Sequence, residues 1–233
     1  ENATLTIGGE SRTSMFGLKM DRDHKYGIIV RNNGNLVIDN AEIYSENHLF
    51  EINVIDDGEL TVKSDSNIHD SVSLKIKGEN SPEVRIEDST VSGEVDIIGG
   101  DLHVENSEFT DDNVDINPDY VYIRNTTFAA PLDDFVNTTG RLIGVSVPDN
   151  NIAVSGDGWL EYYRWIRFDV MSNESHPLSN AEITVSSIYR SYSSKGYTDD
   201  DGIVEIPVLT NNITSSGEPP QNIGYYHISG NYS

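Results

Sequence analysis

The sequence has 233 residues, with 15 basic and 39 acidic side chains and a formal net charge of −24. A surface this negative repels phosphate backbones, and no stretch approaches the ~20 apolar residues of a membrane span, so neither nucleic-acid binding nor membrane insertion of this segment is expected. Cysteine is absent, which excludes disulfides, thiolate catalysis and cysteine-based zinc sites.

The first 150 residues contain a short repeat. Two apolar residues stand two apart, a polar corner residue follows, and a further apolar residue comes after the corner. The copies begin at Leu36, Leu60, Val84, Leu102 and Val121, and are 24, 24, 18 and 19 residues apart. The paired apolar residues have the period of a β-strand, and an Asn, Asp or Ser at the corner redirects the backbone. A second alternating run lies between copies, at residues 50–54, 72–76 and 95–97.

A repeat of this length predicts one coil of a right-handed parallel β-helix, a short solenoid that spans residues 1–150. The inward residues of successive coils should stack in buried columns of parallel strands. The expected members are Leu36, Ile38, Leu60, Val62, Val84, Ile86, Leu102, Val104, Val121 and Ile123. Asn40, Asn106 and Asn125 stand at corners, where we expect an inward polar ladder; a binding role is the alternative.

Residues 151–233 form the second predicted domain, beyond a polar, glycine-containing stretch at 148–158. Strand patterns at 166–170, 182–185 and 203–208 are separated by turn-forming residues. Short strands at this spacing predict a small antiparallel β-sandwich, so the whole chain is expected to be all-β.

Three pieces of this second domain occur in the order of a known pattern. They are Trp165-Ile-Arg-Phe-Asp-Val170, Pro177-Leu-Ser-Asn-Ala-Glu-Ile-Thr-Val185 and Thr198-Asp-Asp-Asp-Gly-Ile-Val-Glu-Ile206. The segment resembles the carboxypeptidase-regulatory-like domain, a transthyretin-like β-sandwich. The resemblance implies a domain without an active site of its own. A β-helix followed by such a domain is similar to archaeal extracellular surface proteins.

These features lead us to expect a non-enzymatic, extracellular structural or adhesive component of a cell-surface assembly, such as a surface layer, sheath or filament. Its expected partners are other copies or envelope proteins, with glycans as further ligands. The chain is expected to be secreted, with its leader already removed, and to continue beyond Ser233. The alternative is a carbohydrate-active β-helix that binds or cleaves an envelope or environmental polysaccharide.

No catalytic constellation and no cofactor is expected from the residue pattern. The carboxylate doublets at 56–57, 111–112 and 133–134 stand in turn-like contexts, and solvated corners are the favoured interpretation over the paired acids of a glycosidase. His103 alternates with Leu102 and Val104, so it should point outward. Asp199 and Asp201 precede Gly202 as in the start of a calcium loop; an ordinary turn is favoured, and Ca²⁺ is the alternative.

Two further groups of residues complete the candidate sites. The sequons for N-glycosylation are at Asn2, Asn125, Asn137, Asn173, Asn212 and Asn231. We expect Asn173 and Asn212 to be exposed, and Asn125 to be either a glycan acceptor or a buried ladder residue. Trp159, Tyr163 and Trp165 crowd the domain junction, where packing between the two modules is expected and sugar stacking is the alternative.

Overall fold

The computed structural model describes residues 4–8, 14–18, 26–45, 50–78, 82–188, 192–214, 221–222 and 225–232. Strands make up 65% of the chain, and the described residues contain no α-helix, so the fold is all-β as predicted. The one 3-10 turn described is Pro148–Asn150. Two compact units divide between Leu160 and Glu161, inside strand β21 (Trp159–Asp169). Each unit is described by itself below.

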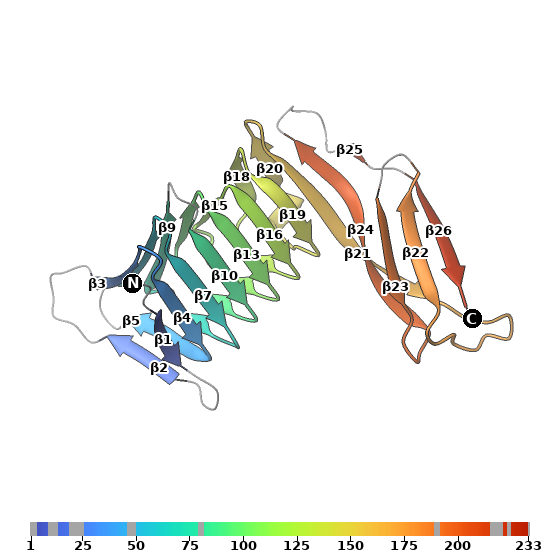
Figure 1. Ribbon diagram of the computed structural model, residues 1–233, viewed down its shortest axis with the longest axis horizontal. Helices are drawn as coiled ribbons and strands as arrows, with labels where there is room; N and C mark the ends of the chain where they lie inside the picture. Colours follow the sequence, from blue (N-terminus) through green and yellow to red (C-terminus); the bar gives the residue numbers. More distant parts are fainter. Residues whose placement is uncertain are drawn as a thin grey trace. The chain divides into compact units, whose positions relative to one another are not determined.

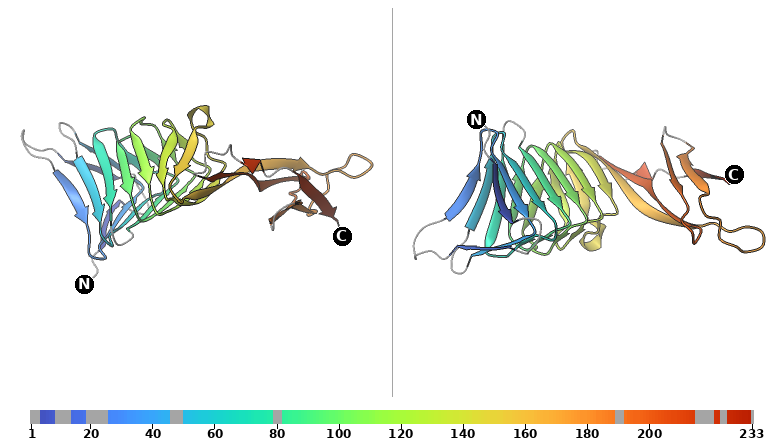
Figure 2. Two further views of the ribbon diagram at one scale, coloured as in Figure 1. Left: turned by 90° about the horizontal axis from the view of Figure 1, so that it is seen from above. Right: turned by 60° about the horizontal axis from the view of Figure 1, so that its bottom comes forward.

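The first unit is a parallel β-solenoid of about six turns. Its first sheet takes one strand from each coil, and all neighbours are parallel. In order, these strands are β1 (Thr4–Gly8), β4 (Asn35–Asp39), β7 (Glu59–Lys63), β10 (Glu83–Glu87), β13 (Asp101–Glu105), β16 (Tyr120–Arg124) and β19 (Thr139–Ile143). They lie side by side in Figure 1, and Figure 2 shows the same coils from two further directions.

Two more parallel sheets close each coil. The second sheet consists of β2 (Ser14–Leu18), β5 (Ala41–Ser45), β8 (Asn67–Ile68), β11 (Thr90–Val91), β14 (Glu108–Phe109) and β17 (Thr127–Phe128). The third sheet consists of β3 (Tyr26–Val30), β6 (Phe50–Ile55), β9 (Val72–Lys77), β12 (Val95–Ile98) and β15 (Val114–Asn117). A parallel pair, β18 (Leu132–Val136) and β20 (Ile152–Ser155), follows. The alternating runs between repeat copies are therefore the third-sheet strands.

The predicted columns of the first sheet are confirmed. Leu36, Leu60, Val84, Leu102 and Val121 are register partners from coil to coil. Ile38, Val62, Ile86, Val104 and Ile123 form a second column in the same register. All ten side chains are at most 1% exposed. The repeat starts read from the sequence thus coincide with the strand register, because a slip of one residue would turn each apolar pair outward.

The other two sheets contribute columns of their own to the same core. In the second sheet, Phe109 stacks on Phe128 with ring centroids 4.6 Å apart and planes 14° from parallel. In the third sheet, Val54, Ile76 and Ile97 are register partners, and each is at most 1% exposed. No coil can bury these faces alone, so the stability of each coil depends on its neighbours.

The second unit contains a small antiparallel sheet in which β22 (Glu182–Ser187) lies between β23 (Ser193–Tyr197) and β26 (Tyr226–Asn231). Strand β24 (Ile203–Thr214) pairs antiparallel with β25 (Gln221–Asn222). The inner face of β22 packs on β24, and the buried residues of this core are Ile183, Val185, Val204, Ile206 and Val208. In β21, Phe168 joins this core, whereas Ile166 is 38% exposed.

Candidate functional site

Each first-sheet strand of the repeat is followed by a corner residue with left-handed backbone geometry. The corner residues are Asn40, Ser64, Asp88, Asn106 and Asn125, with φ between 46° and 59°. Asn and Asp tolerate this region better than other non-glycine residues, because their short polar side chains can bond locally. The polar corner residues of the sequence pattern therefore lie at the turn where the chain leaves the first sheet and enters the second.

Three of these corner side chains form a hydrogen-bonded ladder on the outside of the solenoid. Asn125 Nδ2 donates to Asn106 Oδ1 at 3.0 Å, and Asn106 Nδ2 donates to Asp88 Oδ1 at 3.1 Å. Asn106 and Asn125 are exposed, and Asn40 is half-buried. The predicted inward ladder is therefore wrong in its direction, because the left-handed turn points these side chains outward. Asn125 is therefore not a buried ladder residue, and its role as a glycan acceptor stays a prediction.

The inward position belongs instead to the next hydroxyl residue after the corner. Ser66, Ser89, Ser107 and Thr126 are at most 6% exposed. Their hydroxyls bond to main-chain groups: Ser107 Oγ donates to Glu105 O at 2.7 Å and accepts from Ser89 N at 3.2 Å. Sequence reasoning missed this buried ladder, although Ser or Thr directly follows the corners Asp88, Asn106 and Asn125 and could have indicated it.

An open groove of about 640 Å³, the corner groove, runs along the outward ladder. Its polar lining includes Glu42, Asp65, Asn67, Asp88, Asn106 and Glu108. The lining contains no basic side chain among the described residues, so the groove is acidic. In the part of the chain that the structure describes, no three His, Asp or Glu side chains are grouped so as to hold a metal ion.

A smaller hollow beside Glu42 brings one histidine close to a carboxylate. His69 Nε2 lies 3.9 Å from Glu42 Oε2, and the imidazole contacts the Tyr44 ring edge-on at 6.0 Å. The hydroxyl of Ser71, also in this hollow, accepts a hydrogen bond from Ser45 N at 2.8 Å. The His69 imidazole and the Glu42 carboxylate are too far apart for a hydrogen bond. The Ser71 hydroxyl is hydrogen-bonded to the backbone.

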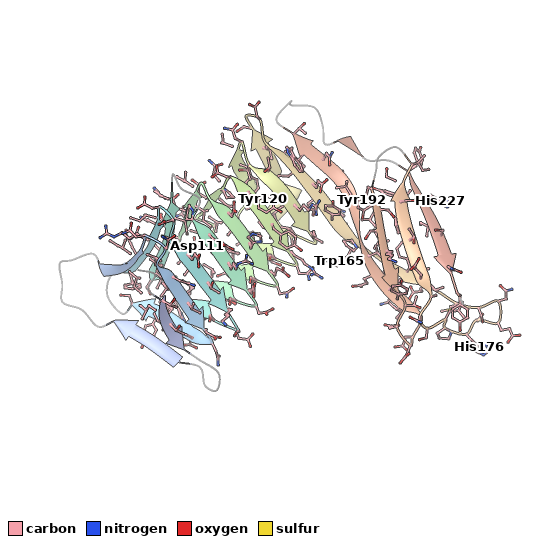
Figure 3. The ribbon with its side chains drawn as sticks, in the orientation of Figure 1. Asp111, Tyr120, Trp165, His176, Tyr192 and His227 are labelled. Atoms are coloured by element: carbon pink, nitrogen blue, oxygen red, sulfur yellow. The ribbon has the colours of Figure 1, made fainter. Side chains whose placement is uncertain are left out.

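His103 lies on the outer face of the first sheet, as the alternation predicts, and is half-buried there. The Tyr120 and Tyr122 rings of the next strand lie 5.9 Å and 6.0 Å from its ring. These three side chains define what we call the tyrosine face, and Tyr120 is labelled in Figure 3. Sequence reasoning placed His103 outward but missed the tyrosines beside it, although the aligned repeat starts contain this register.

Where the side chains of the predicted carboxylate doublets are described, they form hydrogen bonds in turns and loops. Asp57 Oδ1 accepts a hydrogen bond from Asn33 N at 2.9 Å, in the preceding coil. Asp111 Oδ1 accepts one from Asn113 N at 2.7 Å. The side chains of residues 133 and 134 lie outside the described part. In each described doublet, one carboxylate thus accepts a hydrogen bond from a backbone amide between strands.

Asp199 and Asp201 lie in the turn before β24. Asp199 Oδ1 accepts hydrogen bonds from Asp201 N at 3.0 Å and from Ile203 N at 2.9 Å. The turn closes further through Gly202 N, which donates to Asp199 O at 3.1 Å, and Gly202 has φ of 74°. The Asp199 oxygen therefore stabilises the turn, as the favoured interpretation has it, and calcium binding remains the alternative prediction.

The sequons differ in their surroundings. Asn125, Asn137, Asn173 and Asn231 are exposed, and Asn2 lies outside the described residues. Asn212 does not fit the expected exposure: it is half-buried in β24, and its Oδ1 is buried without a hydrogen-bond partner among the described residues. Asn212 pairs with Gln221 in β25, so it lies in a strand at a site that we expected to be exposed.

The junction aromatics are placed as follows. Trp159 is 45% exposed, Trp165 is half-buried and Tyr163 is buried. The Tyr163 hydroxyl donates to Glu161 Oε2 at 2.7 Å, and its ring lies 5.8 Å from that of Tyr192. Packing of these residues between modules stays a prediction.

Comparison of the chain with protein-family models, curated proteins and solved structures gave no match. Among the described residues, no helix is long and apolar enough to cross a membrane.

Proposed function

We propose that this chain is a non-enzymatic structural or adhesive component of an extracellular cell-surface assembly, such as a surface layer, sheath or filament. The observation that carries the proposal is the unbroken parallel register of the first sheet from β1 to β19. Such a stack resists bending and extension, because any deformation must break backbone hydrogen bonds and separate buried columns at once.

The surface chemistry supports the same role. Polar ladders and charged pairs join successive coils on the outside: Lys75 Nζ lies 3.2 Å from Glu51 Oε1, and Lys77 Nζ lies 2.9 Å from Asp96 Oδ2. The net charge of −24 keeps copies hydrated and apart unless a specific interface or a divalent cation joins them. A protein held at high density on a cell surface benefits from both properties.

The finer proposal is that the second unit is a carboxypeptidase-regulatory-like domain of an archaeal-type surface protein. Its supporting observation is that the three motif pieces meet in space. Ala181 N donates to Thr198 Oγ1 at 2.8 Å, and Thr198 N donates to Ala181 O at 3.0 Å. Val170 N donates to Gly202 O at 2.8 Å, which joins the first piece to the third. Residues at motif positions thus hold one another in place.

Two measurements on the native protein test the structural proposal. Antibodies raised against this chain should label intact source cells as strongly as permeabilised ones, because the proposal puts the chain outside the cell. The purified chain should release no reducing ends or unsaturated products from a panel of neutral and acidic polysaccharides. Labelling that requires permeabilisation, or turnover of any polysaccharide, would overturn the proposal.

A second candidate function is glycan binding without cleavage. The tyrosine face favours it, because aromatic rings flanked by polar side chains suit the two surfaces of a sugar.

A further inference from the structure

We infer that the tyrosine face of the first sheet is a binding site for a neutral glycan chain. The inference rests on glycan binding, the second candidate function, and names its site and ligand class. It does not depend on the structural role, because a rod and a ligand site can share one solenoid. It rests on the geometry of three rings, on their immediate neighbours and on the charge of the chain.

The three rings gather on two adjacent strands. His103 of β13 and Tyr122 of β16 are register partners, with ring centroids 6.0 Å apart and planes 38° from parallel. Tyr120, two residues before Tyr122, faces the same side, and its ring lies 5.9 Å from that of His103. All three side chains are half-buried, so each presents part of its ring to solvent.

The direct register partners of the two tyrosines are all polar. Tyr120 stands between Asp101 and Thr139. Tyr122 stands between His103 and Arg141. Protein interfaces have an apolar core inside a polar rim, whereas no direct register partner of either tyrosine in the described strands is aliphatic. A pyranose ring has an apolar face and a rim of hydroxyls, so it can stack on a tyrosine and bond to carboxylate, guanidinium and hydroxyl groups beside it.

The charges favour a neutral glycan over an anionic one. The whole chain carries −24, and Asp101 and Glu83 lie next to the rings on the outer face. Arg85 is already engaged, with its Nη2 2.5 Å from Glu83 Oε1. Arg85 and Arg141 are basic side chains beside the rings, and Glu83 and Asp101 stand on the same face as acidic ones. These local charges balance, so a polyanion would meet the long-range repulsion of the whole chain. Strands repeat every ~4.8 Å, close to the width of one sugar ring, so consecutive sugars can follow consecutive strands.

The test uses the whole chain and defined probes. Co-sedimentation with cellulose, chitin and mannan, and affinity electrophoresis in xylan, glucan and polygalacturonate gels, measure neutral and acidic glycans in parallel. We expect at least one neutral glycan to bind and polygalacturonate to bind more weakly. Tyr122→Ala should raise the dissociation constant about tenfold, because one stacking ring is lost. The Tyr120→Ala/Tyr122→Ala double variant, which lacks both tyrosine rings, should not bind.

Matched variants separate loss of the rings from loss of the fold. Tyr225 is 69% exposed in the second unit, so Tyr225→Ala removes an exposed tyrosine elsewhere and should bind as the parent does. Tyr122→Phe keeps the ring and should retain most of the affinity. Circular dichroism and melting of the double variant should match the parent, since both side chains point away from the core.

Three outcomes would overturn the inference. One is that no neutral glycan in the panel binds. Another is binding that survives in the double variant. The third is self-association of the parent chain in sedimentation velocity that glycans do not affect and that the double variant loses. This result would make the tyrosine face a protein interface. The localisation and turnover assays of the structural proposal are independent of all three.

Discussion

Asn125 donates its side-chain amide to Asn106 Oδ1 across 3.0 Å, from one coil of the solenoid to the preceding one. The same Asn106 donates to Asp88 Oδ1 at 3.1 Å, and all three residues have φ near 50°. The corner thus combines a backbone requirement with an intercoil contact. Because the ladder is exposed, we expect its hydrogen bonds to contribute modestly to the free energy of unfolding. The left-handed backbone preference of the corner residue should contribute more.

Substitution of Asn106 separates these two contributions. Asn106→Ala should lower the free energy of unfolding by about 1–2 kcal/mol, since alanine tolerates positive φ poorly and cannot bond to Asp88. Asn106→Gly loses the same hydrogen bonds but accepts the backbone, so it should be the milder change. Urea denaturation of both variants measures the difference. Equal losses would mean that the side-chain ladder, and not the backbone, dominates the corner.

Leu102 tests the stacked core. It is fully buried between its register partners Val84 and Val121, so Leu102→Ala should cost about 2–5 kcal/mol through lost burial and an unfilled cavity. Thr61→Ala, on the outer face of the same sheet, should change stability by less than about 0.5 kcal/mol. Denaturant unfolding compares the two. A Leu102→Ala variant as stable as the parent would argue against a close-packed column.

How far the sequence predicts this molecule depends on which physical rule acts at each residue. The columns at Leu36 and Ile38 follow from a period of two, which sequence displays directly. The direction of Asn106 depends on how a left-handed corner points its side chain, which a polar residue type alone does not reveal. Asn212 lies in a strand although Asn is a poor strand former, because pairing with β25 overrides its propensity.

The tyrosine face shows a different limit. Its rings come from residues 103, 120 and 122, which are close only because two coils stack in register. The repeat alignment contains that register, so the cluster is predictable in principle. The sheet that carries the rings, and the polar neighbours on both sides of Tyr122, become apparent only from the pairing of β13, β16 and β19.

Thr198 is expected to hold the second unit together. It is 5% exposed, and its hydroxyl accepts from Ala181 N at 2.8 Å and donates to Leu178 O. Thr198→Val keeps the shape but leaves both main-chain groups buried without that partner, which should cost about 1–3 kcal/mol. Thr198→Ser should retain most of the stability. Hydrogen exchange at the Ala181 amide should accelerate in the valine variant only, and unchanged exchange there would contradict the assignment.

Asn173 and Asn212 should differ in glycan occupancy. Asn173 is exposed in the turn region after β21, whereas Asn212 is half-buried in β24 with its Oδ1 enclosed. A glycan on Asn212 would have to displace the pairing with Gln221, so we expect modification at Asn173 and not at Asn212 in the native protein. Peptide mapping by mass spectrometry decides this, and an occupied Asn212 would show that the β24–β25 pairing does not form.

The second unit should lose stability at alkaline pH. Burial raises the pKa of Tyr192 above its ordinary value of 10.0, and burial likewise raises the pKa of Tyr226. A raised pKa means that the fold favours the neutral phenol. This stabilisation is complete below the pKa of the unfolded chain, near 10, and is lost as pH rises through the higher folded value.

Melting temperatures measured from about pH 8 to pH 11 should therefore fall at the alkaline end, as absorbance at the phenolate band rises. The Tyr192 hydroxyl also donates to Pro207 O, so Tyr192→Phe removes a hydrogen bond together with the titrating group. That variant should melt lower than the parent near neutral pH, yet lose less of its own stability between pH 9 and pH 11. Tyr225→Phe, which removes a phenol hydroxyl at an exposed site of the same unit, is the matched control. Parallel pH profiles for the parent and the Tyr192→Phe variant would show that this phenol does not link stability to pH, since removal of the titrating group would then leave the alkaline loss unchanged.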